Sequence, residues 1–223
     1  QAIPVAIEGK DVVGIAQTGT GKTLAYGIPM IQRLQQIQRR GLVILPTREL
    51  AQQVEAALFR MGARVGLRTA VLIGGAPMRP QIQAIAKDPH IIVATPGRLG
   101  DHLKQKTLKL DRVGIVVLDE ADRMLDMGFA PQIQKIFQAL PRERQTMLFS
   151  ATMPPEIMKM AASHMELPIR VEVAPSGTTA ERVTQEIFII HKEAKARLAQ
   201  KLLGEYQGPT LIFTRTKYGA KKL

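Results

Sequence analysis

Residues 12–23 read VVGIAQTGTGKT, and this stretch decides the fold that the rest of the chain has to fit. The short apolar run Val12–Ala16 predicts a buried strand, and apolar residues spaced three to four apart predict a helix over Leu24–Gln38. Between them, Gly19 and Gly21 allow the backbone to curl so that successive N–H groups point inward at the positive end of the helix. The stretch therefore predicts a phosphate-binding loop between a strand and a helix.

Every residue of this loop is a candidate contact of a nucleotide. The set is Ala16, Gln17, Thr18, Gly19, Thr20, Gly21, Lys22 and Thr23, an A/G-x4-G-K-T pattern with alanine where glycine is commoner. Lys22 can reach the terminal phosphates, and the hydroxyl of Thr23 can bind Mg²⁺. The alternative is a glycine-rich turn with a surface lysine. Average residue usage makes a chance match in a chain of this length only about a few per cent.

Further apolar runs indicate a sheet around this first strand. They are Leu42–Leu45, Ala70–Ile73, Ile91–Ala94, Ile115–Leu118 and Met147–Phe149. Most are continuous rather than alternating, which is typical of parallel strands buried on both faces. Helical spacing recurs between them, over Arg48–Met61 and Pro131–Leu140. The alternation predicts a doubly wound α/β domain with its functional residues at the carboxyl ends of the strands.

One of these strands runs into acidic residues. Ile115–Leu118 is followed by Asp119, Glu120, Ala121 and Asp122. We expect Asp119 to hold Mg²⁺ through water, and Glu120 to act as the general base that polarises an attacking water. The alternative is a helix that begins with acidic residues, which is a common and favourable arrangement. The presence of Lys22 and Thr23 at another strand end favours the nucleotide site.

The charge of the chain indicates a polyanionic partner. Its 223 residues include 31 Lys and Arg against 19 Asp and Glu, a formal net charge of +12. Nucleic acid and an anionic membrane surface both fit that balance. Between Arg33 and Arg112 there are 14 basic and 5 acidic residues, a net of +9. We expect this charge on one face of the domain as a phosphate-binding surface, with solvated helix faces as the alternative.

Composition excludes several other classes. Cysteine is absent and there are four histidines, so we expect no disulfide framework and no structural metal. The apolar runs are far shorter than the roughly 20 residues that span a bilayer, and no amphipathic anchor is evident, so we expect no membrane partner. Because the chain begins at Gln1 without methionine or a signal-peptide pattern, we expect a fragment rather than a secreted precursor.

A change of composition predicts a domain boundary. Residues 174–180 are small, polar and turn-rich, as in a linker between a domain over residues 1–173 and a further segment over 181–223. In that segment we expect strands at Val183–Ile190 and Thr210–Phe213 and a helix at Lys192–Leu203. About 40 residues are too few for a second complete α/β domain.

Taken together, the motifs resemble those of the DEAD-box RNA helicases over essentially the whole chain. Besides the phosphate loop and Asp119–Asp122, five further motifs stand in the family's order. They are Pro46–Ala51, Gly74–Gly75, Thr95–Arg98, Ser150–Thr152 and Leu211–Thr216. The stretches Arg123–Phe129 and Phe213–Lys217 resemble the bacterial RhlE-type branch.

The resemblance implies a RecA-like P-loop NTPase domain, followed by a linker and the beginning of a second RecA-like domain. It implies ATP-dependent, RNA-stimulated separation of RNA strands in the cytoplasm, with ATP and Mg²⁺ bound. Lys22, Asp119 and Glu120 would be catalytic, and Asp122, Ser150 and Thr152 would couple hydrolysis to RNA, through hydrogen bonds to Asp122. The residues implied in RNA binding are Pro46, Thr47, Arg48, Gly74, Gly75, Thr95, Pro96, Gly97 and Arg98.

Alternative roles for these residues stay open. The same side chains would serve an ATP-gated RNA clamp that never unwinds, whereas a P-loop transporter or signalling NTPase needs no RNA motifs. Arg48 or Arg98 could form a salt bridge within the domain instead of binding RNA. Ser150 and Thr152 could cap a strand end and have no coupling role. Aromatic residues make up 4% of the chain, which favours contacts to the RNA backbone over base stacking.

Two departures from the family pattern affect the expected activity. The family's adenine-recognising glutamine would precede Gln1, and the motif that carries its arginine finger would follow Leu223. We therefore expect the given chain, as a catalytically incomplete fragment, to hydrolyse ATP poorly by itself.

Overall fold

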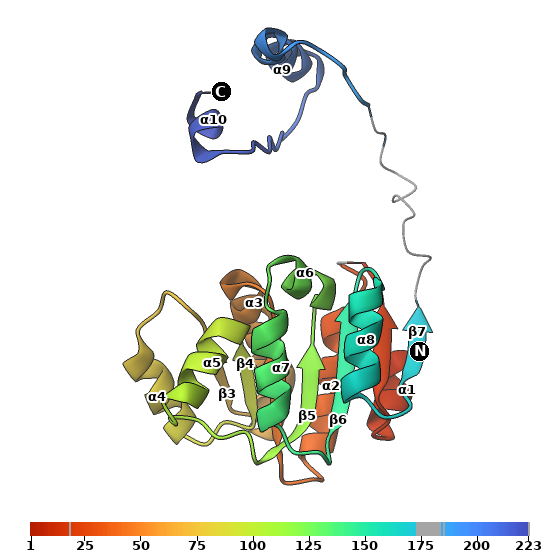
Figure 1. Ribbon diagram of the computed structural model, residues 1–223, viewed down its shortest axis with the longest axis vertical. Coiled ribbons are helices and arrows are strands. Elements are labelled where there is room, and N and C mark those ends of the chain that lie inside the picture. Colours follow the sequence, from red (N-terminus) through yellow and green to blue (C-terminus); the bar gives the residue numbers. More distant parts are fainter. Residues whose placement is uncertain (18, 173–183, 185, 223) are drawn as a thin grey trace. The chain divides into compact units, whose positions relative to one another are not determined.

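The computed structural model describes residues 1–17, 19–172, 184 and 186–222 (Figure 1). The chain divides into two compact units, Gln1–Thr178 and Thr179–Leu223, which are described separately.

The first unit is built on a parallel sheet. Its strands are β1 (Val12–Ile15), β2 (Arg40–Ile44), β3 (Thr69–Leu72), β4 (Ile91–Ala94), β5 (Val113–Leu118), β6 (Gln145–Ser150) and β7 (Ile169–Glu172). They lie in the order β3-β4-β2-β5-β6-β1-β7, and every pairing among them is parallel. The predicted parallel sheet is confirmed. Only β7 was not predicted, because its side chains are mostly exposed and half of them are charged, unlike those of the buried strands.

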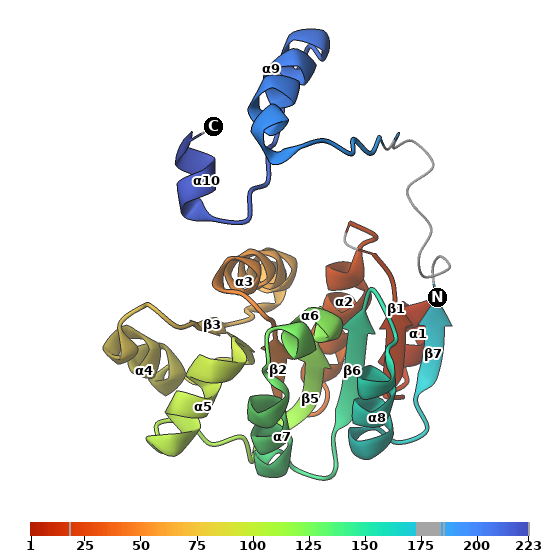
Figure 2. The ribbon, with the colours of Figure 1, turned by 45° about the horizontal axis from the view of Figure 1, so that its top comes forward.

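Helices cover both faces of this sheet. They are α1 (Ala2–Ile7), α2 (Lys22–Leu34), α3 (Arg48–Gly62), η1 (Ala63–Val65), α4 (Met78–Ala86), α5 (Pro96–Lys104), α6 (Ala121–Asp126), α7 (Ala130–Ala139) and α8 (Pro155–His164). Helices α1, α2 and α3 lie on one face of the sheet and α5 to α8 on the other (Figure 2). Their buried residues form two separate cores. Along β2, Leu42 and Ile44 enter the second core while Val43 enters the first. Because both faces are covered, the interior of the strand is apolar throughout.

The second unit lacks the predicted strands among its described residues. It contains η2 (Lys192–Ala194), α9 (Lys195–Glu205) and α10 (Lys217–Lys222), so the predicted helix is present. The prediction of strands was wrong for residues 186–190 and Thr210–Phe213, which are exposed and without regular structure. An apolar run forms a strand only beside a partner strand, and the described part of this unit offers none. The predicted linker, residues 174–180, lies outside the described residues.

Among the described residues, no helix is both long and apolar enough to cross a membrane. The same part of the chain contains no cluster of three or more His, Asp or Glu side chains placed to hold a metal ion.

The packing of Gly14 in β1, which lies between β6 and β7, gives a test of this fold. A Cβ added at Gly14 would lie 2.5 Å from the ring of Phe149 on neighbouring β6, whereas nothing lies within 4 Å of one added at Gly100 in α5. We expect Gly14→Ala to lower the free energy of unfolding by about 1–3 kcal/mol through overpacking. Gly100→Ala should raise it by roughly 0.5–1 kcal/mol because alanine favours a helix. Urea denaturation of both variants checks this; equal effects of the two would contradict it.

Candidate active site

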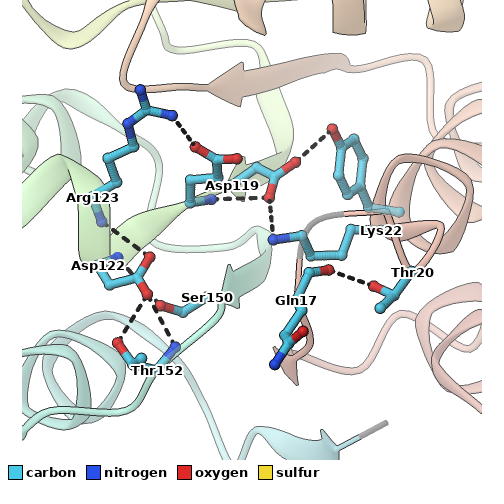
Figure 3. Close-up of polar contacts among 10 residues, drawn as sticks. Gln17, Thr20, Lys22, Asp119, Asp122, Arg123, Ser150 and Thr152 are labelled. Atoms are coloured by element: carbon cyan, nitrogen blue, oxygen red, sulfur yellow. Dashed lines mark hydrogen bonds and ion pairs between the residues drawn. The ribbon is translucent and has the colours of Figure 1, made fainter. Parts of the chain in front are cut away.

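The predicted phosphate loop connects β1 to α2. Gly19 and Gly21 have φ of 89° and 88°, and Gly21 is the N-cap of α2. A Cβ at either position would meet nothing within 4 Å, so the left-handed backbone, and not lack of space, is what requires glycine. The hydroxyl of Thr20 closes the turn by donating a hydrogen bond to the carbonyl of Gln17 at 2.8 Å (Figure 3). Thr18 lies outside the described residues.

Lys22 is the clearest sign of a ligand in this loop. Its side chain is 8% exposed, and its ammonium has no hydrogen-bond partner within the described structure. The Asp119 carboxylate lies 3.8 Å from the Lys22 Nζ, too far for a direct hydrogen bond (Figure 3). A buried ammonium without hydrogen bonds is costly unless another group satisfies it. A phosphate held by the loop would supply that group, so the residues present fit a nucleotide.

A cavity of about 430 Å³ adjoins the loop, which is enough for a small-molecule ligand. Thr20, Gly21 and Lys22 give it a polar side, and Ile3, Leu24 and Phe149 contribute apolar surface. The pairing of cationic and apolar walls suits a molecule with phosphates at one end and a flat organic group at the other.

Asp119 is held at the end of β5, buried in contact with α2. It accepts hydrogen bonds from the backbone N–H of Glu120 at 2.9 Å and from the hydroxyl of Tyr26 at 3.0 Å. Burial raises the pKa of the Asp119 carboxyl above its usual value, while the charge of Lys22 and the Tyr26 hydrogen bond oppose that rise. Burial, reinforced by the charge of Asp119, raises the pKa of Tyr26, so its hydroxyl stays protonated and donates.

Tyr26 was not among the residues predicted from the sequence. Its hydroxyl is hydrogen-bonded by both Thr23 and Asp119, and therefore links the two candidate Mg²⁺ ligands. A magnesium ion bound with a nucleotide needs only one or two protein oxygens because phosphates and waters complete its shell. The hydroxyl and carboxylate brought together here fit that requirement. Within the sequence Tyr26 is one more residue on a buried helix face, so only its contact with β5 distinguishes it.

Glu120 points away from Asp119 toward a different partner. Its backbone is left-handed, with φ 53° and ψ 51°, an uncommon conformation for a residue with a side chain. The Glu120 carboxylate accepts a hydrogen bond from Arg123 Nη1 at 3.1 Å, and only 12% of the Glu120 side chain is exposed. Arg123, which was not predicted to be a site residue, thus orients the candidate base. An acid three residues before an arginine on a helix was the available signal.

Asp122 joins the ends of β5 and β6. The Asp122 Oδ2 accepts hydrogen bonds from the Thr152 hydroxyl at 2.8 Å and the Thr152 N–H at 3.0 Å, and the Asp122 N–H donates to the Ser150 hydroxyl at 3.2 Å (Figure 3). The predicted hydrogen bonds to Asp122 are therefore present. Burial alone would raise the pKa of Asp122, but hydrogen bonds from Thr152, Ser150 and the Arg123 N–H outweigh it and hold that pKa below its usual value.

The residues predicted to bind RNA follow three neighbouring strands. Pro46, Thr47 and Arg48 follow β2, the pair Gly74–Gly75 follows β3, and Thr95–Arg98 follows β4. Because β3, β4 and β2 are adjacent, these loops share one half of the sheet's carboxyl edge. The nucleotide residues occupy the other half, after β1, β5 and β6.

Arg48 and Arg98 differ in their surroundings. The Arg98 side chain is 12% exposed, its Nη1 donates to the carbonyl of Ala76 at 2.9 Å, and its Nε lies 3.8 Å from the Asp101 carboxylate. Arg98 therefore makes contacts within the domain, which was the alternative to RNA binding. Arg48 is exposed, and its guanidinium lies against Gly75. A side chain at position 75 would overlap the Arg48 guanidinium. Within the described part of the chain, no carboxylate pairs with Arg48.

The expectation that the basic window lies on one face of the domain was wrong. Arg40 begins β2, Arg68 immediately precedes β3 and Arg112 immediately precedes β5. These arginines therefore lie at the amino edge of the sheet, opposite the carboxyl-edge motifs. Residues close together in sequence are separated because the two ends of a parallel strand lie on opposite edges.

Comparison with known proteins gives a consistent match. The family described as DEAD/DEAH box helicase matches residues 1–160. A DEAD-box ATP-dependent RNA helicase, RhpA, of Helicobacter pylori is 43% identical over 100% of this chain and 46% of its own length. An ATP-dependent rRNA helicase, RRP3, of Debaryomyces hansenii is 43% identical over 97% of this chain and 46% of its own.

Further matches agree with these. A DEAD-box ATP-dependent RNA helicase, CshA, of Geobacillus kaustophilus is 44% identical over 97% of this chain and 47% of its own length. The crystal structure of a hypothetical ATP-dependent RNA helicase from Sulfolobus tokodaii superposes with a TM-score of 0.73 at 38% identity, over 78% of this chain and 51% of that one. The chain thus spans about half the length of the relatives it matches.

The Asp122 hydrogen bonds predict a pH-dependent contribution to stability. Since they hold the folded pKa below the usual value near 3.8, their stabilisation is fully present above that value and is lost as pH falls through the lower folded pKa. Thr152→Val removes one donor, so it should raise the pKa of Asp122 and cost about 1 kcal/mol of unfolding free energy at neutral pH.

Carbon-13 carboxyl titration and urea denaturation at neutral pH and near pH 3 measure both effects. Ser163→Ala is the control, because the Ser163 hydroxyl bonds a backbone carbonyl, that of Lys159, and no carboxylate. A Thr152→Val cost that is the same at both pH values would contradict the role of the ionised Asp122.

Proposed function

The chain belongs to the DEAD/DEAH box helicase family, and on that premise we propose that it is the ATP-binding domain of an ATP-dependent RNA helicase. The observation that carries the proposal is the buried ammonium of Lys22, which has no hydrogen-bond partner among the described residues, beside the glycine loop and the buried Asp119. RNA-stimulated ATP hydrolysis would be coupled to local separation of RNA strands. The relatives are named as helicases, which favours a helicase over an ATP-gated clamp that never unwinds.

Each group at the nucleotide half of the edge has a chemical role in this proposal. The loop N–H groups and Lys22 bind the phosphates, while Thr23 and Asp119 hold Mg²⁺, Asp119 through water. Mg²⁺, when bound, neutralises phosphate charge and polarises the phosphoryl group that is transferred. Glu120 orients the attacking water and accepts its proton. Arg123 positions Glu120 by the 3.1 Å hydrogen bond to its carboxylate.

RNA would bind along the other half of the same edge. The exposed guanidinium of Arg48 provides charge, and the Gly74–Gly75 loop and Gly97 provide backbone N–H groups for phosphates. Arg98 supports these loops from beneath through its hydrogen bond to Ala76. Such contacts do not read base sequence, and the 2′-hydroxyl would distinguish RNA from DNA.

Asp122 would couple the acidic loop after β5 to the end of β6, within the nucleotide half of the edge. Asp122 lies two residues after the candidate base Glu120 and is tied to Ser150 and Thr152 after β6. A shift of the segment that follows β6 would thus move the acidic loop as well. This geometry supports the proposed coupling role of Asp122, Ser150 and Thr152.

Finer assignments belong to the same proposal. The stretches Arg123–Phe129 and Phe213–Lys217 support placement in the bacterial RhlE-type branch. Two of the relatives described above are bacterial, which supports a bacterial, cytoplasmic protein.

Glu120→Gln in the complete protein tests the assignment of the base. We expect RNA-stimulated ATP turnover to fall at least about 100-fold, because the amide cannot accept the proton. ATP affinity should stay close to that of the unaltered protein, whereas Lys22→Ala should weaken it at least about tenfold by removing the phosphate ligand. Single-turnover hydrolysis and fluorescent nucleotide binding measure the two quantities. Normal turnover of Glu120→Gln, or normal nucleotide affinity of Lys22→Ala, would refute the proposed roles.

The two arginines give a separate test of the RNA surface. Arg48→Ala should weaken RNA binding and reduce the slope of log affinity against log salt by about 0.7–0.9, the value for one phosphate contact. Arg98→Ala should instead lower the free energy of unfolding by about 1–3 kcal/mol, because it leaves the Ala76 carbonyl unpaired. Lys159→Ala, an exposed charge on α8, is the control. An unchanged salt slope in Arg48→Ala would exclude Arg48 from the phosphate contacts.

A further inference from the structure

A second group of arginines gathers at the amino edge of the sheet, remote from the motifs. It consists of Arg39, Arg40, Arg68 and Arg112, called here the amino-edge cluster. Backbone hydrogen bonds of the sheet bring its members together: the Arg40 N–H donates to the Arg112 carbonyl at 2.8 Å, and the His90 N–H donates to the Arg68 carbonyl at 2.8 Å. The cluster is therefore fixed by strand register and not by flexible loops.

One residue, Asp88, contacts three of these four arginines, two through its carboxylate and one through its backbone carbonyl. Asp88 Oδ1 lies 2.6 Å from Arg40 Nη2 and 3.1 Å from Arg112 Nη1, and the Asp88 carbonyl accepts from Arg68 Nη2 at 2.9 Å. Arg39 pairs with exposed Glu143, at 3.5 Å between Arg39 Nη2 and Glu143 Oε2. Each guanidinium has five N–H donors, and these contacts use only a minority of them. Four cations thus face two carboxylates, and most N–H donors of the cluster stay available to an anionic ligand.

Beside the cluster is a cavity of about 360 Å³ with two kinds of wall. Ile31, Leu34, Val65 and Leu67 provide an apolar floor, and Arg39, Arg40, Arg112 and Asp88 form the polar rim. Val65 is 51% exposed, so the floor is accessible to a ligand. A flat base against the apolar side chains and a phosphate on the guanidiniums match this pairing of surfaces.

We propose that this cavity and the amino-edge cluster form a second contact site for RNA, which holds one nucleotide unit of a strand that extends beyond the motif edge. The inference rests on the proposed function in one respect, that the protein acts on RNA. The strands between the two edges are four to six residues long, so the edges are roughly 15–20 Å apart. A 6-nucleotide RNA bound along the motif edge would have few nucleotides left to cross that distance, whereas a 30-nucleotide RNA would reach both edges.

The test uses the double variant Arg68→Ala/Arg112→Ala in the complete protein. Both side chains are largely exposed, and Arg40 keeps its partner Asp88, so the fold should be retained. The matched control, Lys135→Ala/Lys159→Ala, removes the same charge from exposed positions on α7 and α8. The readouts are the affinity for 30- and 6-nucleotide single-stranded RNA, its salt dependence, and RNA-stimulated ATP hydrolysis at saturating RNA.

We expect the double variant to bind the 30-nucleotide RNA roughly three- to tenfold more weakly, with a salt slope smaller by about 1–2. Its affinity for the 6-nucleotide RNA and its stimulated ATP turnover should match those of the control. The double variant and the control could instead bind the long RNA with equal affinity and equal salt slope while RNA stimulates ATP hydrolysis normally. That result would overturn the second site alone. Absence of any RNA stimulation in the unaltered protein would instead overturn the proposed function.

Hydrogen–deuterium exchange separates the possible occupants. The 30-nucleotide RNA should slow exchange of amides in residues 86–91 and 110–114 of the unaltered protein, but not of the double variant. Uridine monophosphate and an oligoglutamate peptide are the comparison probes. Protection of these segments by either probe, with none by RNA, would overturn the assignment to an RNA strand in favour of a free nucleotide or an acidic protein segment.

Discussion

The structure depends on one constraint, the burial of a parallel sheet on both faces. Apolar side chains from β2 enter the two cores alternately, so the strand interior has no room for polar chemistry. Polar residues are consequently displaced to the strand ends, where backbone groups are free and helices begin. Both the nucleotide loop and the motifs assigned to RNA lie at the carboxyl edge for this reason, and the amino-edge cluster occupies the opposite ends of the same strands.

The burial of Lys22 and Asp119 shows how this edge is prepared for an anion. Removing two opposite charges from water is repaid only when their hydrogen-bonding capacity is satisfied. Asp119 is satisfied in part by Tyr26 and by the N–H of Glu120, whereas Lys22 is not, at 3.8 Å from the carboxylate. The imbalance leaves a buried cation beside the glycine loop, with hydrogen-bonding capacity that a phosphate would satisfy.

Local sequence patterns were sufficient where the chemistry is contiguous. The loop at residues 16–23 and the acidic turn at Asp119–Asp122 each combine a strand, a bend and a helix start within a few residues, and both lie where predicted. Tyr26 was missed because its importance arises from a contact with Asp119 that no spacing rule distinguishes from an ordinary helix position, whereas the spacing of Arg123 from Glu120 was an available signal. The exposed edge strand β7 was missed for the opposite reason, since it lacks the apolar signature of a buried strand. The apolar run at Thr210–Phe213 has that signature but no neighbouring strand among the described residues, so it forms no strand.

The fold class, the phosphate loop and the family could be predicted without coordinates, because apolar period and glycine placement are local and motif order is a linear property of the chain. Only the tertiary structure decided which loops are neighbours. The order β3-β4-β2-β5-β6-β1-β7 separates the RNA motifs from the nucleotide residues along one edge. It also places Arg40, Arg68 and Arg112 on the opposite edge, although they lie between those motifs in sequence. The physical reason is that strand order and direction are set by long-range pairing and helix packing, which no window of sequence contains.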